Sequence, residues 1–97
     1  MSLPKKLANA VRNNDINYPF TQNDFNNWII NKQITHEDGK KYESSTVNSY
    51  CNHNDILSSS KTKNKDLVYI PNTNPRKYIL KEDFMQIVEL LIKKASN

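Results

Sequence analysis

The sequence contains one glycine, Gly39, and one cysteine, Cys51, among its 97 residues. A single glycine cannot build the glycine-rich loops that hold nucleotide phosphates, so sites of that kind are excluded. A single cysteine excludes an internal disulfide framework and indicates a reducing compartment, which we expect to be the cytoplasm. No apolar run is long enough to cross a membrane, and no apolar stretch follows Lys5 and Lys6 as it would in a secretory signal.

Side chains with metal-binding or catalytic chemistry are also scarce. Besides the methionines, only His36, Cys51 and His53 are soft metal ligands. Helical spacing turns Cys51 inward and His53 outward, so the two cannot bind one ion or act as a nucleophile and its base. The acidic residues form no recognisable nuclease cluster. We therefore expect no metal site, no cofactor and no enzyme activity in this chain.

Acidic residues are nearly absent from residues 56 to 81. This stretch holds six basic residues and one acid, Asp66, for a net charge of +5, whereas eight basic and nine acidic residues give the remainder −1. A one-sided cluster of this kind is the electrostatic footprint of a polyanionic partner. The alternative is that a lysine-rich loop only keeps a small protein soluble. The six basic residues are Lys61, Lys63, Lys65, Arg76, Lys77 and Lys81.

The first two helices are predicted from apolar periodicity and capping. Residues 3 to 14 form the first, with Leu3, Leu7, Ala10 and Val11 on its apolar face. Thr21 and Asp24 have the spacing of a capping box, so the second helix begins after Thr21 and ends near Asn31 or Lys32. Phe20 and Phe25 have the spacing of a hydrophobic staple. Trp28 shares a face with Phe25 and Ile29, which predicts a core position for it.

A third, short helix is predicted over residues 44 to 54. Val47, Tyr50 and Cys51 stand at i, i+3 and i+4 and face inward, and Ser44 or Ser45 is expected to cap the start. The outward side chains are small hydrogen-bonding groups that suit base edges in a major groove. A solvated surface helix has the same composition, so this helix alone does not decide its role.

The last third of the chain predicts a hairpin and a helix. Residues 67–70 and 77–80 are β-branched and aromatic strands joined by the turn-rich segment 71–76, and 58–65 is expected to be a mobile loop. An additional short strand is possible at 33–35. A helix over 83–95, starting at Glu82 or Asp83, carries a wide apolar stripe that the first helix or a second subunit must cover. The stripe is Phe84, Ile87, Val88, Leu91, Ile92 and Ala95.

Taken together, these elements predict one α+β domain, mainly α, over residues 1–97: three helices, a β-hairpin wing and a C-terminal packing or dimerisation helix. This order resembles the winged helix-turn-helix class. Phe20-Thr21 before a helix with a tryptophan, Ser44-Ser45-Thr46-Val47 and Arg76-Lys77-Tyr78-Ile79-Leu80 resemble small winged-helix domains of bacterial restriction and mobile-element proteins. The resemblance covers residues 18 to 81. The chain departs from it by lacking a glycine at Arg76 or Lys77 and by its long 33–43 loop.

The resemblance implies a bacterial or phage double-stranded DNA-binding domain, acting in transcription regulation or as a DNA-targeting accessory. The alternative is a protein-interaction module of the same fold that does not bind DNA. A homodimer, or a fused or partner protein, would use Phe84, Val88 and Leu91. By resemblance, Ser45, Thr46, Asn48, Ser49 and Asn52 would face bases, and Lys61, Lys63, Lys65, Arg76 and Lys77 would meet phosphates.

Overall fold

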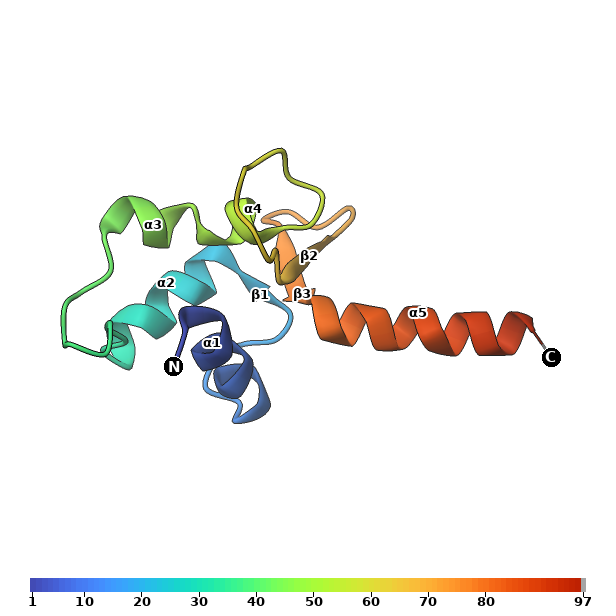
Figure 1. Ribbon diagram of the computed structural model, residues 1–97, viewed down its shortest axis with the longest axis horizontal. Coiled ribbons are helices and arrows are strands. Elements are labelled where there is room, and N and C mark those ends of the chain that lie inside the picture. The colour runs from blue at the N-terminus through green and yellow to red at the C-terminus, as the bar shows by residue number, and fades with distance from the viewer. Residues whose placement is uncertain (97) are drawn as a thin grey trace.

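A computed structural model describes residues 1–96 of the chain. It contains a small three-stranded antiparallel sheet with helices around it (Figure 1). The expected α+β class, mainly α, is confirmed. None of the described helices is both long and apolar enough to span a membrane. In chain order the elements are α1 (Leu3–Arg12), β1 (Phe20–Thr21), α2 (Gln22–Asn31), α3 (Ser44–Asn48), α4 (Tyr50–Asn54), β2 (Leu67–Ile70), β3 (Lys77–Leu80) and α5 (Lys81–Ala95).

The sheet has the strand order β1-β3-β2, and β3 is its central strand. Both strands of the predicted hairpin are confirmed with their bounds, and Tyr69 lies opposite Tyr78 in their register. The possible strand at residues 33–35 is wrong, because only an isolated bridge from Thr35 to Lys41 forms there. The strand that completes the sheet is instead β1, Phe20–Thr21, where Phe20 lies opposite Tyr78. A strand of two residues is too short to show the alternation that predicts strands.

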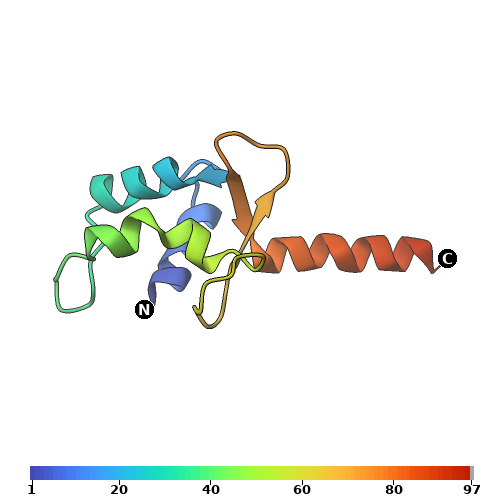
Figure 2. The same cartoon turned by 90° about the horizontal axis from the view of Figure 1, so that it is seen from above.

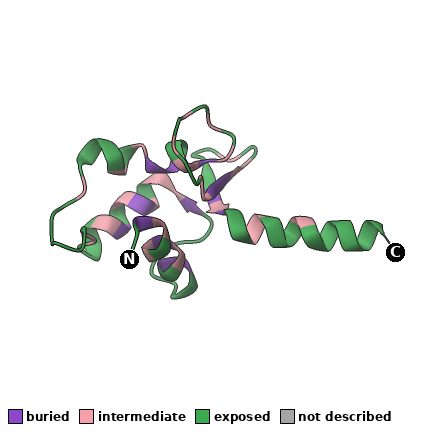
Figure 3. Ribbon diagram, in the orientation of Figure 1, coloured by how far each residue is buried: buried purple, intermediate pink, exposed green. Residues whose placement is uncertain are grey.

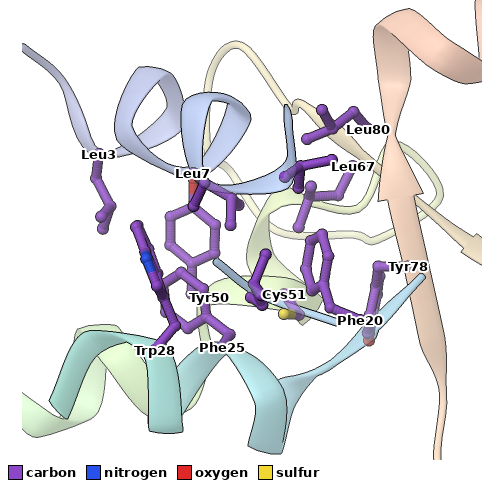
Figure 4. Close-up of a cluster of buried hydrophobic side chains, with 13 residues drawn as sticks. Leu3, Leu7, Phe20, Phe25, Trp28, Tyr50, Cys51, Leu67, Tyr78 and Leu80 are labelled. Atoms are coloured by element: carbon purple, nitrogen blue, oxygen red, sulfur yellow. The ribbon is translucent and has the colours of Figure 1, made fainter. Parts of the chain in front are cut away.

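The core lies between α1, α2, α4 and the sheet (Figure 4). The predicted apolar face of α1 is confirmed, since Leu3, Leu7, Ala10 and Val11 are all buried. Apolar burial of this kind is the main stabilising contribution to folding. Across from α1, the rings of Phe25 and Tyr50 stack with centroids 4.5 Å apart, and Trp28 is buried beside them. The prediction that Trp28 belongs to the core is therefore confirmed.

The N-terminus of α2 is closed by the predicted capping box. The Asp24 backbone N–H donates to Thr21 Oγ1 at 3.0 Å, and the Thr21 N–H donates to Asp24 Oδ2 at 3.0 Å. These two bonds satisfy backbone donors that the start of a helix leaves without partners. Phe20 and Phe25, on either side of the cap, are both fully buried in the same cluster. The predicted start of α2 is confirmed, and the helix ends at Asn31 as expected.

The predicted third helix is two short helices, α3 and α4, with a break at Ser49. Ser49 has φ −110° and ψ 5°, which interrupts the helical backbone. The expected cap by Ser44 or Ser45 is wrong, because both lie inside the first turn and Glu43 occupies the N-cap without a side-chain bond. The predicted end is confirmed, since Asp55 is the C-cap of α4.

α5 projects from the domain, and its length makes the molecule 51 Å long against 28 and 25 Å in the other directions (Figure 1). No residue of α5 is buried (Figure 3), so of the two covers expected for its stripe, the first helix and a second subunit, α1 does not serve. The reason is the connection, because Leu80 ends β3 and caps the helix that starts at Lys81. Without a loop between them, α5 cannot turn back toward α1.

Candidate nucleic-acid interface

The outer surface of α3 and α4 carries the side chains predicted to face bases. Tyr50 and Cys51 are buried and Val47 is half-buried against the core, so the inward face is confirmed. Ser49 is half-buried, and its hydroxyl donates to the carbonyl of Ser45 at 2.7 Å. The remaining members of the set, Ser45, Thr46, Asn48 and Asn52, are exposed.

A side chain from α2 is inserted at the break between α3 and α4. The backbone N–H of Cys51 donates to Gln22 Oε1 at 2.9 Å, and Gln22 Nε2 donates to the carbonyl of Val47 at 2.7 Å. Val47 and Cys51 are four residues apart, so a continuous α-helix would bond these two backbone groups to each other. Insertion of a side chain into this ladder is a known cause of helix kinks. Gln22 therefore both accounts for the break and satisfies the backbone groups that it frees.

The same network extends to one of the predicted base-facing residues. Gln22 Nε2 also donates to Asn26 Oδ1 at 2.7 Å, and Asn26 Nδ2 donates to Asn48 Oδ1 at 3.2 Å. These bonds orient the Asn48 amide from α2. The sequence did not predict these roles for Gln22 and Asn26, because their partners lie 25 and 22 residues away along the chain. The only local signal for this network is that the amide side chains of Gln22 and Asn26 stand one helical turn apart, where they can bond to each other.

The basic segment 56–66 is attached to the end of α4. Ser60 Oγ donates to the carbonyl of His53 at 2.6 Å, and Lys65 Nζ donates to the carbonyl of Ser58 at 2.6 Å. Thr62 shares an open depression of about 360 Å³ with Ser45 of α3, with Ser49 at the break and with His53 of α4. The segment therefore lies beside the polar surface of α3 and α4. That it is mobile stays a prediction.

Asp55 anchors the start of this segment to the core. It is the one charged residue among the described residues that is buried, with 2% of its surface exposed. Its carboxylate accepts the backbone N–H of Leu57 at 3.1 Å, and the neighbouring Ile56 N–H donates to the carbonyl of Leu67 at 2.9 Å. Buried carboxylates need such partners. These bonds fix where the basic segment leaves α4 and where it enters β2.

The turn between β2 and β3 holds the second group of basic side chains. Thr73 Oγ1 donates to the carbonyl of Ile70 at 2.7 Å and accepts the N–H of Lys77 at 2.9 Å, which closes the turn. The guanidinium of Arg76 lies 4.6 Å from the centre of the Tyr69 ring, within cation–π range. Arg76 and Lys77 are exposed, so the hairpin presents two cations on an ordered turn.

The five predicted phosphate-contacting residues differ in exposure. Lys61, Lys63, Arg76 and Lys77 are exposed, whereas Lys65 is half-buried. Lys65 uses one of its three N–H donors within the loop, so it braces the segment as well as carrying charge. Within residues 1–96, none of the five forms an ion pair with a carboxylate.

The polar helices and both basic segments lie on the same side of the molecule. In Figure 1, α3, α4, segment 56–66 and the β2–β3 turn follow the upper edge, and α1 lies below them. In Figure 2, which views that edge from above, α4 lies between segment 56–66 and the turn. We call this combined surface the polar-basic face. It consists of α3, α4, segment 56–66 and the β2–β3 turn.

The Cys51 thiol lies beneath this face and is buried. Burial raises the pKa of the Cys51 thiol to about 12, so the thiol is protonated at neutral pH. His53 is exposed on the opposite side of α4, and the inward and outward assignments of these two residues are confirmed. Nowhere in residues 1–96 do three histidine, cysteine, aspartate or glutamate side chains converge on a possible metal position.

Comparison with known proteins gives no relative: no protein-family model, curated protein or solved structure matches the chain. The interpretation of the polar-basic face therefore depends on its own residues.

Proposed function

We propose that this chain is a winged-helix domain that binds double-stranded DNA through the polar-basic face. The observation that carries the proposal is the position of the exposed α3–α4 side chains on the same side as both basic segments (Figures 1 and 2). A common side favours DNA binding, whereas opposite sides would favour a protein-interaction module. The order α1, β1, α2, α3–α4, β2, β3 and the sheet order β1-β3-β2 also resemble the winged-helix arrangement.

In this proposal α3 and α4 enter the major groove. An asparagine can pair with the two polar groups of adenine, and serine or threonine can serve several bases. Asn48 keeps its amide N–H donors available, because only its Oδ1 is used by Asn26. Asn52, Ser45 and Thr46 are exposed beside it. Side chains oriented before binding lose less conformational freedom on association, which favours a fixed Asn48.

Segment 56–66 and the β2–β3 turn contact the phosphates on the two sides of that groove. Lys61, Lys63, Arg76 and Lys77 are exposed and have no carboxylate partner within the described residues, so binding breaks no ion pair. Arginine suits a phosphate because its planar fork donates two hydrogen bonds at once. Phosphate contacts orient the protein, and base contacts supply any specificity.

The domain catalyses no reaction in this proposal. It acts as a regulator or as a DNA-targeting accessory, of the kind found in small winged-helix domains of bacterial restriction and mobile-element proteins. If DNA is cut or modified, another domain or subunit does so.

A titration of labelled duplex DNA at several salt concentrations tests the proposal. Each neutralised phosphate releases counterions, so with roughly three to five contacts log K should fall against log salt with a slope of about −3 to −5. A single strand of the same sequence serves as the comparison and should bind more weakly. A salt-independent signal, or no duplex binding by folded protein at low salt, overturns the proposal.

An interaction module without DNA binding is the second candidate, and one observation favours it. The exposed apolar stripe of α5 is a surface for another protein. In Figure 1, α5 extends sideways beyond the domain from below the β2–β3 turn, so its stripe and the polar-basic face are separate surfaces. Duplex binding at low salt separates the candidates.

A further inference from the structure

The longest helix of the chain leaves an apolar stripe uncovered. Ile87, Leu91 and Ile92 are 51%, 63% and 60% exposed. Figure 3 shows most of α5 as exposed. Helical spacing puts them on one side of α5, and Gln86, Glu89 and Lys93 lie on the other side together with Leu90, which is also exposed. Contiguous apolar surface of this kind marks an interaction site. The stripe is Phe84, Met85, Ile87, Val88, Leu91 and Ile92.

Only the first turn of α5 is fixed to the domain. Glu82 forms an ion pair with Arg12, and the Tyr18 hydroxyl donates to Asp83. The same hydroxyl accepts the backbone N–H of Leu80 at 2.8 Å, which holds the junction between β3 and α5. These contacts set the direction of the helix. They leave the stripe beyond the first turn for another molecule.

We infer that a second copy of this chain covers the stripe, with the two α5 helices antiparallel. The charges select this arrangement. The first turn carries two acidic side chains, Glu82 and Asp83, beside Lys81, and the charged side chains of the last turn are only basic, Lys93 and Lys94. Antiparallel helices bring acidic ends beside basic ends and oppose the helix dipoles. Parallel helices would bring like charges together at both ends.

The position of one ionic pair follows from the helix geometry. Asp83 and Lys94 are eleven residues apart, close to three full turns, so they lie along the same edge of the stripe. In an antiparallel pair the same edges of the two helices meet. Asp83 of each copy then lies near Lys94 of the partner subunit, and two-fold symmetry forms this contact twice.

A groove at the base of α5 extends the interface. It has a volume of about 330 Å³ and lies between α1 and α5, with Pro4, Ala8 and Met85 among its lining residues. α5 is about 22 Å long, so the far end of an antiparallel partner helix lies beside the groove. The groove is also lined by two acidic residues, Asp66 and Glu82, and two basic residues, Lys5 and Lys81, so it adds apolar contact without selecting the charge of the partner helix end.

Sedimentation of the full chain over a range of concentrations tests for this dimer. The parent should approach twice the 11.3 kDa of one chain as its concentration rises. Leu91→Glu and Val88→Glu should each shift the dissociation constant at least tenfold toward monomer. Gln86→Glu, on the opposite side of α5, is the matched control and should dimerise like the parent. Circular dichroism checks that each variant is folded.

Charge reversal tests the antiparallel direction. The comparison is made in a Tyr18→Phe background, because the Tyr18 hydroxyl otherwise bonds to Asp83 within one chain. In that background Asp83→Lys or Lys94→Asp alone should weaken the dimer, and the two changes together should restore it. A parent that stays monomeric at all concentrations, or a dimer that survives both Leu91→Glu and Val88→Glu, overturns the inference. Failure of the double reversal to restore dimerisation overturns the antiparallel arrangement. None of these measurements involves DNA, so their outcome is independent of the proposed function.

Discussion

The side-chain amide of Gln22 separates two backbone groups that a helix would pair, the carbonyl of Val47 and the N–H of Cys51. The Cys51 N–H lies 2.9 Å from Gln22 Oε1, although the two residues are 29 positions apart in the chain. Gln22 stands at the first position of α2, directly after the Thr21 cap. The start of α2 therefore holds both the capping box of this helix and the side chain that produces the break between α3 and α4.

Gln22→Ala should destabilise the protein by about 1–2 kcal/mol. The change removes two hydrogen bonds to partly buried backbone groups, although those groups can regain part of the stabilisation by bonding to each other. Denaturant unfolding measures the difference. Asn23→Ala, at the exposed neighbouring position, is the control and should stay within about 0.5 kcal/mol of the parent. Equal stability of the Gln22 variant and the parent would contradict the role assigned to this amide.

Thr21→Ala should cost about 1 kcal/mol, because it removes the acceptor of the Asp24 backbone N–H and half of the capping box. Thermal or denaturant unfolding provides the measurement. Thr46→Ala, in the exposed first turn of α3, provides the comparison for a threonine without a capping bond. The capping assignment fails if the two variants are equally stable.

The features that the sequence predicted well are local. The capping box of Thr21 and Asp24, the stripe of α1 and the strands 67–70 and 77–80 each depend on residues close together in the chain. The break in the third helix was not predictable, because it is made by Gln22 from another helix. The direction of α5 depends on the absence of a loop after Leu80, which its apolar periodicity does not encode.

The same distinction applies to the polar-basic face. The charge excess of residues 56–81 and the polar residues of 44–52 could be read from the sequence. The sequence could not show that these two groups lie on the same side of the molecule. Their placement on one side depends on two features of the fold. Ser60 and Asp55 attach segment 56–66 to α4, and the register of the sheet positions the β2–β3 turn. These contacts join residues whose pairing has no periodic signal.

Leu7→Ala and Leu91→Ala should differ widely in their effect on the free energy of unfolding, although both remove the same atoms. Leu7 is 1% exposed in the core, so its truncation should cost about 2–5 kcal/mol. Leu91 is 63% exposed, so its truncation should change the stability of the dilute monomer by less than about 0.5 kcal/mol. Chemical unfolding at low protein concentration compares them. A large destabilisation by Leu91→Ala under these conditions would mean that α5 packs on its own domain.

The Cys51 thiol should be unreactive in the folded protein. Burial raises its pKa to about 12, so almost no thiolate is present at pH 8, and the side chain is fully buried. Because the pKa is higher in the folded state, its contribution to stability is complete below about pH 9, the usual value, and is lost as the pH rises toward 12. A thiol reagent should modify the protein quickly only after denaturation. Rapid modification at pH 8 without unfolding would rule out this environment.

Asn48→Ala and Asn52→Ala should weaken binding to a specific site by about 1–3 kcal/mol each, since each removes a base contact. Binding to unrelated duplexes should change little, because phosphate contacts carry no sequence information. Site selection from random DNA identifies a preferred sequence, and titration with that sequence and a scrambled duplex gives both affinities. Equal weakening on the two duplexes would assign these asparagines to structure or to phosphate binding.

DNA binding by the polar-basic face can be measured through the salt dependence of two matched double variants. Arg76→Ala with Lys77→Ala removes two charges from the β2–β3 hairpin, and Lys40→Ala with Lys41→Ala removes two exposed charges from the loop before α3. We expect the first variant to bind duplex DNA more weakly, with a slope of log K against log salt that is flatter by about two, because each removed cation neutralises one phosphate in the parent. The second variant should keep the slope of the parent. Equal slopes for the two variants would contradict DNA binding through this face.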